Sequence, residues 1–530
     1  MSTPKKFNTT GVCIPTLHYM VDTSSVTKQI IENYIVPGEY FTINRARQYG
    51  KTTTLELLFQ QLKKDYIVLD ISFEAADEYF QSLKALAQGL WMDIGDLLLC
   101  RNTSPALQEE WLRPLSDDFP LRDLGRRITS LCSKSEKKVV LMIDEVDKNA
   151  DNQIFLTFLG LLREKYLKQK LGKDRTFHSV ILAGVYDIKN LKLKMHPKED
   201  SKYNSPWNIA ADFNVNMAFS EDGIAGMLSE YEKDYHTGMD TDSMSRMIYA
   251  YSSGYPFLVS RLCKLLDEQV AGTDEYPSRS DAWTNNGFQK AVRLLLFEKN
   301  TLFDDMFKKL NEFKSLSDML ASLLFSGRSF SYNPDTEEIA TGIRFGFIRS
   351  ADNQAIIANR IFEMRLYNYY LSQEDISNND TCQSALQAKN QFIHGNVLDV
   401  DLILRKFTEH FTEVYAACSD KFIEENGRRL FLLYLRPIIN GTGNYYVESR
   451  TRSMTRTDII VDYLGKQYII ETKIWRGNEY NTRGEKQLIG YLDDYHLEKG
   501  YMLSFCFNKN KVPGVHEIFL GGKILIETIV

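Results

Sequence analysis

The chain reads NRARQYGKT from Asn44 to Thr52, between the short apolar run YFTI and the amphipathic run TTTLELLFQQLKK. A short apolar run rich in aromatic and β-branched residues is typical of a buried strand, and apolar residues spaced by three and four are typical of a helix. The stretch is therefore expected to be a loop that leads from a strand into the N-terminus of a helix.

A loop in this context can bind phosphate groups, because the first backbone amides of the helix point at the ligand. In the pattern GxxxxGKT the lysine reaches the β and γ phosphates and the hydroxyl residue holds Mg²⁺, which predicts these roles for Lys51 and Thr52. Arg45 stands where the pattern has its first glycine, which leaves the sharpness of the turn open. The predicted nucleotide-binding residues here are Arg45, Ala46, Arg47, Gln48, Tyr49, Gly50, Lys51, Thr52 and Thr53.

A second motif strengthens this interpretation. The apolar run VVLMI ends in the acids Asp144 and Glu145, as a central strand of a nucleotide-binding sheet does. Asp144 is expected to join Thr52 around Mg²⁺, and Glu145 to polarise the attacking water as a catalytic residue. The expected cofactors are ATP and Mg²⁺, with Mn²⁺ as a substitute, and the sequence leaves open whether ATP is hydrolysed or only bound.

The region from about residue 38 to 215 alternates short apolar runs with amphipathic stretches. The apolar runs are EYFTI, DYIVLDISF, KKVVLMIDEVD, FHSVILAGVYD and FNVNMAF. Strands that alternate with helices predict an α/β fold with a parallel sheet covered on both faces.

The rest of the chain divides by composition. Residues 216–275 have a helical pattern and are expected to form a lid, and residues 276–372 have the element order of a winged helix. The polar residues 373–398 are expected to be a linker before a last α/β domain at 399–530. The nucleotide-binding core is then 1–215.

Composition excludes several classes. At 530 residues the chain is long enough for roughly three or four domains. A net charge of -6 argues against a general nucleic-acid coat, and the seven cysteines contain no CxxC pair typical of zinc sites. With no signal-like or membrane-spanning apolar run, we expect a cytoplasmic protein with no membrane partner.

The run IETKIW at 470–475 places Glu471 and Lys473 on one face of a strand, since strand side chains alternate. A hairpin turn centred on Gly465 and Lys466 would pair Asp458 with Lys473. Asp458 and Glu471 would then hold Mg²⁺, with Lys473 beside them to orient or deprotonate water. The alternative is an exposed, salt-bridged hairpin face.

RARQYGKTTTL resembles the phosphate loop of AAA-ATPase-like bacterial proteins that carry a C-terminal PD-(D/E)XK nuclease-like domain. Arginine at the position of Arg45 is frequent in those relatives. The resemblance implies metal-ligand and water-activating roles for Asp458, Glu471 and Lys473, although Thr457 replaces the proline of the motif. It also implies a further catalytic acid at Glu425, with Glu424 as its rival, and a helix motif that contains Gln487 and Tyr491.

Gly254-Tyr255-Pro256 is similar to the lid motif of related signal-transduction ATPases, which implies that Pro256 and Arg261 approach the nucleotide. A simple helix start with an exposed arginine is the alternative. Asp187 follows a predicted strand, where it would act either as a sensor or as a helix N-cap.

These patterns predict an ATP-switched, Mg²⁺-dependent nuclease that acts on nucleic acid, with DNA favoured over RNA, and by resemblance a role in defence against foreign genetic elements. The alternatives are a nucleic-acid-binding or protein-binding scaffold without cleavage. Homo-oligomerisation and strand specificity are left open. The basic and aromatic residues expected to contact the nucleic acid are Arg450, Arg452, Arg456, Arg476, Arg483, Lys486, Tyr445, Tyr446 and Trp475.

Overall fold

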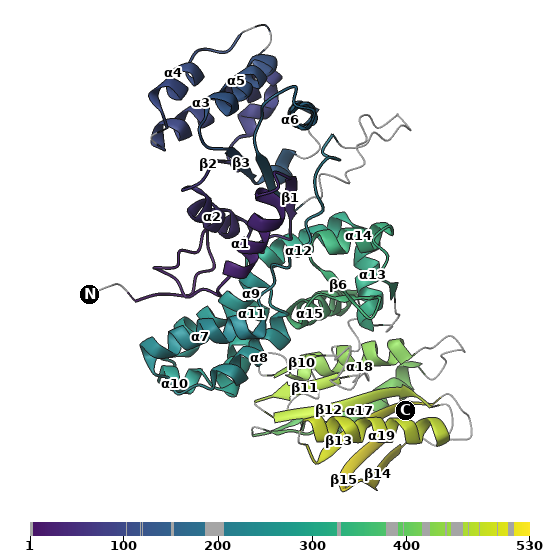
Figure 1. Cartoon of the computed structure of the whole chain (residues 1–530). Coiled ribbons are helices and arrows are strands. Elements are labelled where there is room, and N and C mark those ends of the chain that lie inside the picture. The colour runs from purple at the N-terminus through teal and green to yellow at the C-terminus, as the bar shows by residue number, and fades with distance from the viewer. Residues whose placement is uncertain are drawn as a thin grey trace. The chain divides into compact units, whose positions relative to one another are not determined.

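The structure is a computed structural model that describes residues 4–101, 103–116, 118, 120–149, 153–185, 206–325, 330–377, 391–395, 397–415, 424–439, 443–446, 459–464, 466–475, 478–495, 497–506 and 514–530. The chain forms two compact units (Figure 1). The first contains residues 1–291 and 340–347, and the second contains residues 292–339 and 348–530. The finer division into five parts stays a prediction.

The first unit contains a parallel sheet. Its strands among the described residues are β1 (Tyr40–Asn44), β2 (Ile67–Ser72), β3 (Val139–Asp144) and β4 (Ser179–Gly184), in the order β1-β4-β3-β2. The neighbouring pairs are all parallel. The predicted α/β fold with a parallel sheet is confirmed, and β4 lies between the strands that lead to the two motifs.

Both faces of this sheet are covered. Strand residues such as Leu141 and Leu182 pack with helices α3 (Leu83–Cys100), α5 (Pro120–Lys134) and α6 (Gln153–Lys170). The alternate residues, such as Met142 and Ile181, pack with α1 (Ser24–Ile30) and α2 (Lys51–Leu62). This is why the central strands read as continuous apolar runs. The other α-helices that lie wholly in this unit, among its described residues, are α4 (Pro105–Trp111), α7 (Glu221–Tyr235), α8 (Thr241–Ser252), α9 (Pro256–Leu265) and α10 (Arg279–Ala282).

The prediction of a fifth strand at FNVNMAF is wrong. Ala211 makes an isolated parallel bridge to Phe41, and residues 212–219 have no strand structure. Side chains occupy backbone groups of this segment: the Tyr34 hydroxyl accepts from the Asn214 amide at 3.1 Å, and the Asn216 side chain accepts from the Ala218 amide at 3.0 Å. Amides that donate to side chains are not available for a strand ladder, and a local bond such as that of Asn216 competes with the ladder.

After α11 (Asn285–Phe297), the chain forms α12 (Thr301–Glu312), α13 (Lys314–Phe325), β5 (Phe330–Ser331), α14 (Glu337–Arg344), β6 (Ile348–Ala351), β7 (Gln354–Ile357) and α15 (Arg360–Ser377). The short strands form a sheet in the order β5-β7-β6. The predicted polar turn between two strands is at Asp352 and Asn353, which both have positive φ, as a two-residue hairpin turn requires.

The C-terminal part contains β8 (Ile393–His394), β9 (Val397–Leu398), α17 (Val400–Tyr415), α18 (Glu424–Ile439), β10 (Gly443–Tyr446), β11 (Ile459–Tyr463), β12 (Lys466–Ile474), α19 (Asn478–Asp494), β13 (Lys499–Phe505), β14 (Gly514–Leu520) and β15 (Lys523–Ile529). Strands β10 to β15 form a mixed sheet in the order β10-β11-β12-β13-β15-β14. Phe505 of β13 packs against Phe411 of α17 on one face, whereas Gly500 of β13 lies under Leu488 and Leu492 of α19 on the other.

The predicted register of the β11–β12 hairpin is wrong by two residues. Ile460 pairs with Ile469 and Tyr463 with Lys466, so the chain reverses between Tyr463 and Lys466. Leu464 has a φ of 48°, an uncommon left-handed conformation for a residue other than glycine. A shift of two residues preserves the side-chain alternation, so Glu471 and Lys473 still share a face.

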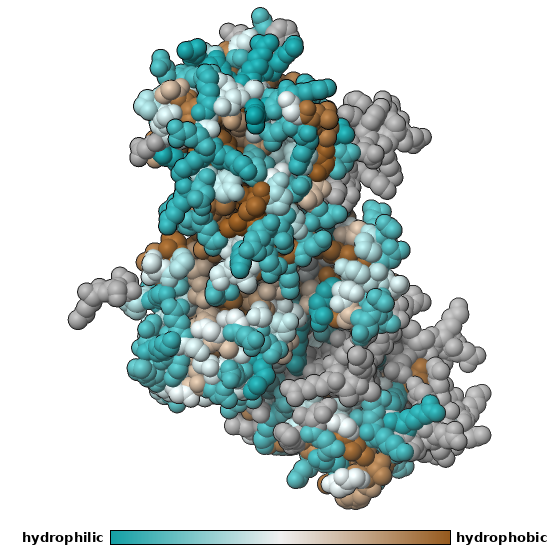
Figure 2. Space-filling view, viewed as in Figure 1, coloured by the Kyte–Doolittle hydropathy of each residue, from teal (hydrophilic) through white to brown (hydrophobic). Residues whose placement is uncertain are grey.

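The visible surface is mostly hydrophilic, with separate apolar patches (Figure 2). Within the part of the chain that the structure describes, no helix combines the length and the apolar character needed to cross a membrane.

Candidate functional site

The GKT loop and the acid-ended strand meet at the carboxyl end of the parallel sheet. The Thr52 hydroxyl at the start of α2 donates a hydrogen bond of 2.6 Å to the Asp144 carboxylate at the end of β3. Gly50 precedes α2 with a φ of 79°, a conformation that a glycine adopts at little cost. The two predicted Mg²⁺ ligands are therefore neighbours, although they are 92 residues apart in sequence.

Lys51 is buried, and its ammonium donates hydrogen bonds of 3.0 Å to the carbonyls of Arg45 and Ala46. Burial lowers the pKa of Lys51, whereas the nearby charges of Asp147, Glu145 and Asp144 oppose that effect. Through these two hydrogen bonds the lysine closes the loop on itself. A bound phosphate would have to replace these carbonyls as its partner.

Glu145 follows Asp144 with a φ of 55°, an uncommon conformation for a residue other than glycine. Its backbone amide donates to the Asp144 carboxylate at 2.9 Å. Burial, and then the charge of Asp144, raise the pKa of the Glu145 carboxyl above its usual value. A backbone in an uncommon conformation, together with a carboxyl whose pKa is raised, fits the role of a residue that polarises water.

The side chain of Arg45 is anchored away from the lysine. One guanidinium nitrogen donates to the Val215 carbonyl at 2.7 Å, and the group lies 5.0 Å from the centre of the Phe213 ring. The Arg45 amide donates to the Gly184 carbonyl at 3.1 Å, at the end of β4. The arginine therefore ties the start of the loop to the chain around it.

The lid motif touches the loop directly. The Tyr255 hydroxyl donates to the Arg47 carbonyl, and the rings of Tyr255 and Tyr49 meet edge to face at 4.8 Å. Pro256 is the first residue of α9, and Arg261, on the same helix, is half-buried. The start of α9 therefore lies beside the nucleotide loop.

Gly254 makes this approach feasible. It has a φ of 73°, and a Cβ there would lie 2.1 Å from the Phe219 carbonyl oxygen. The Phe219 amide also donates to the Gly254 carbonyl at 2.9 Å. Only glycine fits this turn without backbone movement.

The predicted charged face of β12 is present and buried. Glu471 is 2% exposed and Lys473 9% exposed, and the Lys473 ammonium lies 3.2 Å from the Glu471 carboxylate. The alternative of an exposed, salt-bridged face is therefore wrong at these two positions. Gly484 of α19 admits the lysine, because a Cβ there would lie 2.5 Å from its ammonium nitrogen.

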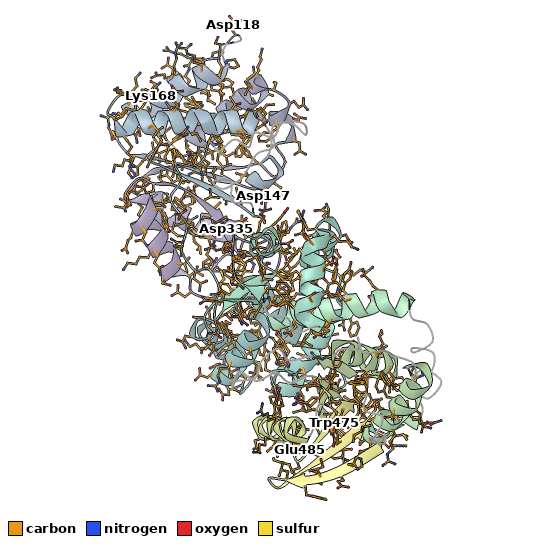
Figure 3. All side chains as sticks on the ribbon, turned by 90° about the vertical axis from the view of Figure 1, so that its right-hand side faces the viewer. Asp118, Asp147, Lys168, Asp335, Trp475 and Glu485 are labelled. Atoms are coloured by element: carbon orange, nitrogen blue, oxygen red, sulfur yellow. The ribbon has the colours of Figure 1, made fainter. Side chains whose placement is uncertain are left out.

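On α19, the Gln487 amide donates to the Tyr491 hydroxyl at 2.7 Å, so these two predicted residues form a pair. Arg483 and Lys486 on this helix are exposed, Tyr445 is buried, and Trp475 follows β12 half-buried (Figure 3).

Several predicted residues lie outside the described part of the chain: Asp187, Arg450, Arg452, Arg456, Thr457, Asp458 and Arg476. Glu424 and Glu425 begin α18, but the structure describes only their backbone.

Two residues in the same face as Glu471 were not predicted. Ser504 of β13 pairs with Lys473 and donates a hydrogen bond of 2.9 Å to Glu527 of β15, and both are buried. Their strands alternate apolar and polar residues only weakly, and contacts between distant strands leave no spacing signal in the sequence.

The oxygen donors at the loop fit a magnesium ion, since Mg²⁺ prefers a hydroxyl and a carboxylate together with phosphate and water oxygens. Thr52 and Asp144 would hold it. In the described residues no group of three or more His, Cys, Asp or Glu side chains forms a metal cluster, so a second ion at Glu471 would need ligands from elsewhere.

A parallel sheet whose GKT loop contacts the acid at the end of β3, with β4 between β1 and β3, defines a P-loop ATPase. Residues 13–373 match the AAA-like domain family, so the chain belongs to that family. The C-terminal α/β part lies beyond the match. No curated protein matches the chain.

Several solved structures are similar to the chain. A Walker-type ATPase of Pyrococcus abyssi has a TM-score of 0.42 and 14% identity, and the match covers 66% of this chain and 96% of that chain. The ORC2 protein of Aeropyrum pernix, in ADPNP–ADP complexes, has a TM-score of 0.36, 9% identity and coverages of 65% and 93%. The ORC1 protein of Aeropyrum pernix, in complex with DNA, has a TM-score of 0.31, 10% identity and coverages of 88% and 93%.

Proposed function

We propose that this protein binds and hydrolyses ATP with Mg²⁺ and that the nucleotide state switches a second activity in the C-terminal α/β part. The Thr52–Asp144 hydrogen bond carries the ATPase part, because it joins the hydroxyl and the carboxylate that would share the ion. Lys51 supplies the charge for the β and γ phosphates, and Glu145 polarises the attacking water.

The test of this part is ATP binding and phosphate release by wild type, Lys51→Ala and Glu145→Gln proteins. We expect Lys51→Ala to lose binding, because a buried ammonium is removed from the phosphate site. We expect Glu145→Gln to bind ATP but release phosphate at least about a hundredfold more slowly. Hydrolysis by the Glu145→Gln protein at the wild-type rate would overturn the catalytic role.

The second activity that we propose is Mg²⁺-dependent cleavage of phosphodiester bonds, with DNA favoured. The buried Glu471–Lys473 pair supports it, since replacing buried ion pairs by apolar residues is often neutral or stabilising, and such a pair is therefore poorly explained by stability alone. In this proposal Asp458 and Glu471 hold the ion, Lys473 activates water, and Glu425 and Gln487 complete the site. Defence against foreign genetic elements is the biological role that the family resemblance suggests.

Cleavage is tested with a panel of single- and double-stranded DNA and RNA, with Mg²⁺ or Mn²⁺, with and without ATP. The Lys473→Ala protein should cut nothing, whereas the control Lys466→Ala, which removes an exposed lysine from the same strand, should cut as the wild type does. Intact nucleic acid in every wild-type lane would remove the nuclease part of the proposal.

The burial of Glu471 and Lys473 against each other also favours a second candidate function. A paired carboxylate and ammonium satisfy each other's charge without an ion, as in an inactive fold that only binds nucleic acid or a protein. Equal nucleic-acid affinity of wild type and Lys473→Ala, with no cleavage by either, would select this scaffold function.

A contact within the first unit suggests how the switch is transmitted. Gly346 belongs to residues 340–347, which lie in the first unit and which we propose to be part of a winged helix. It has a φ of 71°, and a Cβ there would lie 2.7 Å from the Cβ of Ala46. A movement of the nucleotide loop would therefore press on this segment. This supports a lid role for the winged helix, with Pro256 and Arg261 approaching the nucleotide from α9.

A further inference from the structure

Asp147 lies in the short 3-10 helix η3 (Val146–Asn149) that follows β3, and no role is assigned to it above (Figure 3). Its carboxylate accepts a hydrogen bond from the backbone amide of Val185, the residue that follows β4. A Cβ at Gly184 would lie 2.5 Å from the same carboxylate oxygen. The absence of a side chain at Gly184 thus lets Asp147 reach the backbone at the end of β4.

This contact connects two parts of the ATP site. On one side, the Gly184 carbonyl accepts from the Arg45 amide at 3.1 Å, and the Arg45 carbonyl in turn accepts from Lys51 at 3.0 Å. On the other side, Asp147 is two residues from Glu145, whose left-handed backbone is also held by the carboxylate of Asp144. The strained backbone of Glu145 is therefore fixed at both ends, by Asp144 and through Asp147.

A simple cap does not explain this arrangement. A capping carboxylate would accept from amides of its own helical turn. Asp147 accepts from Val185, the residue that follows β4, and its charge is among those that oppose the effect of burial on the pKa of Lys51. Both observations connect Asp147 to the site rather than only to its own turn.

We propose that Asp147 is a positioning residue for ATP hydrolysis, which holds Glu145 at a fixed place relative to the end of β4 and the nucleotide loop. This inference rests on the proposed ATPase function. Misplacing a catalytic group by about 1 Å can cost about a hundredfold in rate while the binding of the substrate is little changed. The expected signature is therefore a loss in kcat without a matching loss in affinity.

The experiment compares Asp147→Ala, Asp147→Asn and Gly184→Ala with wild type. Binding is measured with a fluorescent ATP analogue, kcat by phosphate release, and stability by Tm. Asp147→Ala and Gly184→Ala should lower kcat at least about tenfold, with Kd within about threefold of wild type. Asp147→Asn should keep most of the rate, because its side-chain oxygen can still accept from the Val185 amide.

Glu164→Ala is the matched control, because it removes an exposed carboxylate from α6 of the same unit and should change neither kcat nor Kd. A wild-type kcat in Asp147→Ala would overturn the inference, as would kcat and affinity that fall together with Tm in all three variants. A wild-type protein that binds ATP without hydrolysing it would overturn the proposed ATPase function itself, and this inference with it.

Discussion

Glu145 is the residue whose ionisation should set the acid limb of ATP hydrolysis. Burial and Asp144 raise its pKa above the usual 4.5, so the carboxylate that polarises water is lost as pH falls through the raised value. We expect kcat at saturating ATP to decline at a higher pH than an exposed glutamate would cause. Protonation also removes a buried charge from the folded protein. As pH falls from the folded pKa of Glu145 toward 4.5, this residue should therefore increase the free energy of unfolding.

The measurement is kcat against pH for wild type, with unfolding followed over the same range for wild type and Glu145→Gln. The variant carries no titrating group at this position, so its stability should lack the gain that Glu145 contributes. A rate that is flat down to pH 4.5, or identical stability profiles for the two proteins, would contradict the assignment.

At the scale of elements, the turn that precedes α9 places the start of this helix beside the nucleotide loop. Gly254→Ala would put a side chain 2.1 Å from the Phe219 carbonyl oxygen at a positive φ, and should cost at least about 3 kcal/mol of unfolding free energy. Gly226→Ala in the exposed middle of α7 meets nothing within 4 Å and should stabilise by about 0.5–1 kcal/mol. Denaturant unfolding of both variants measures the contrast, and shifts of the same sign would contradict the turn geometry.

Helix α19 offers a second matched pair. Gly484→Ala places a Cβ 2.5 Å from the Lys473 ammonium nitrogen, which is too close. The ammonium must therefore move, and it can do so because it is the flexible end of its side chain. If Lys473 activates water, cleavage should fall at least about tenfold while Tm stays near that of wild type. Gly490→Ala on the same helix meets nothing within 4 Å, so cleavage by that protein should be unchanged. Equal cleavage by the two variants would show that Lys473 does not activate water.

At the scale of the whole molecule, two sites in separate units should be separable by mutation and coupled by nucleotide. Lys473→Ala should hydrolyse ATP within about twofold of wild type, because its removal leaves the Thr52–Asp144 contact intact. Lys51→Ala should lose both ATP binding and any ATP-dependent part of cleavage. Parallel ATPase and nuclease assays on the two variants test this, and full ATP-stimulated cleavage by Lys51→Ala would refute the coupling.

Local patterns in the sequence were sufficient to predict the strands and the helix start that surround the nucleotide loop. The apolar runs at 40–44 and 139–144 became β1 and β3, and Pro256 began α9, because strand and helix preferences here agree with burial. The face shared by Glu471 and Lys473 was also predictable, since alternation survives a shift of two residues in register. The exact register was not predictable, because Leu464 adopts a positive φ that its residue type does not indicate.

The sequence by itself determined the strand-and-helix pattern of the α/β core, its nucleotide loop and the acids that end β3, because each depends on residues that are close along the chain. Only the tertiary structure decided that Arg45 is anchored at Val215, that Tyr255 contacts Arg47, and that the Asp147 carboxylate reaches β4. These partners lie far apart in sequence. Their pairing follows from how strands and helices pack, and packing depends on the shape of the whole core rather than on any local pattern.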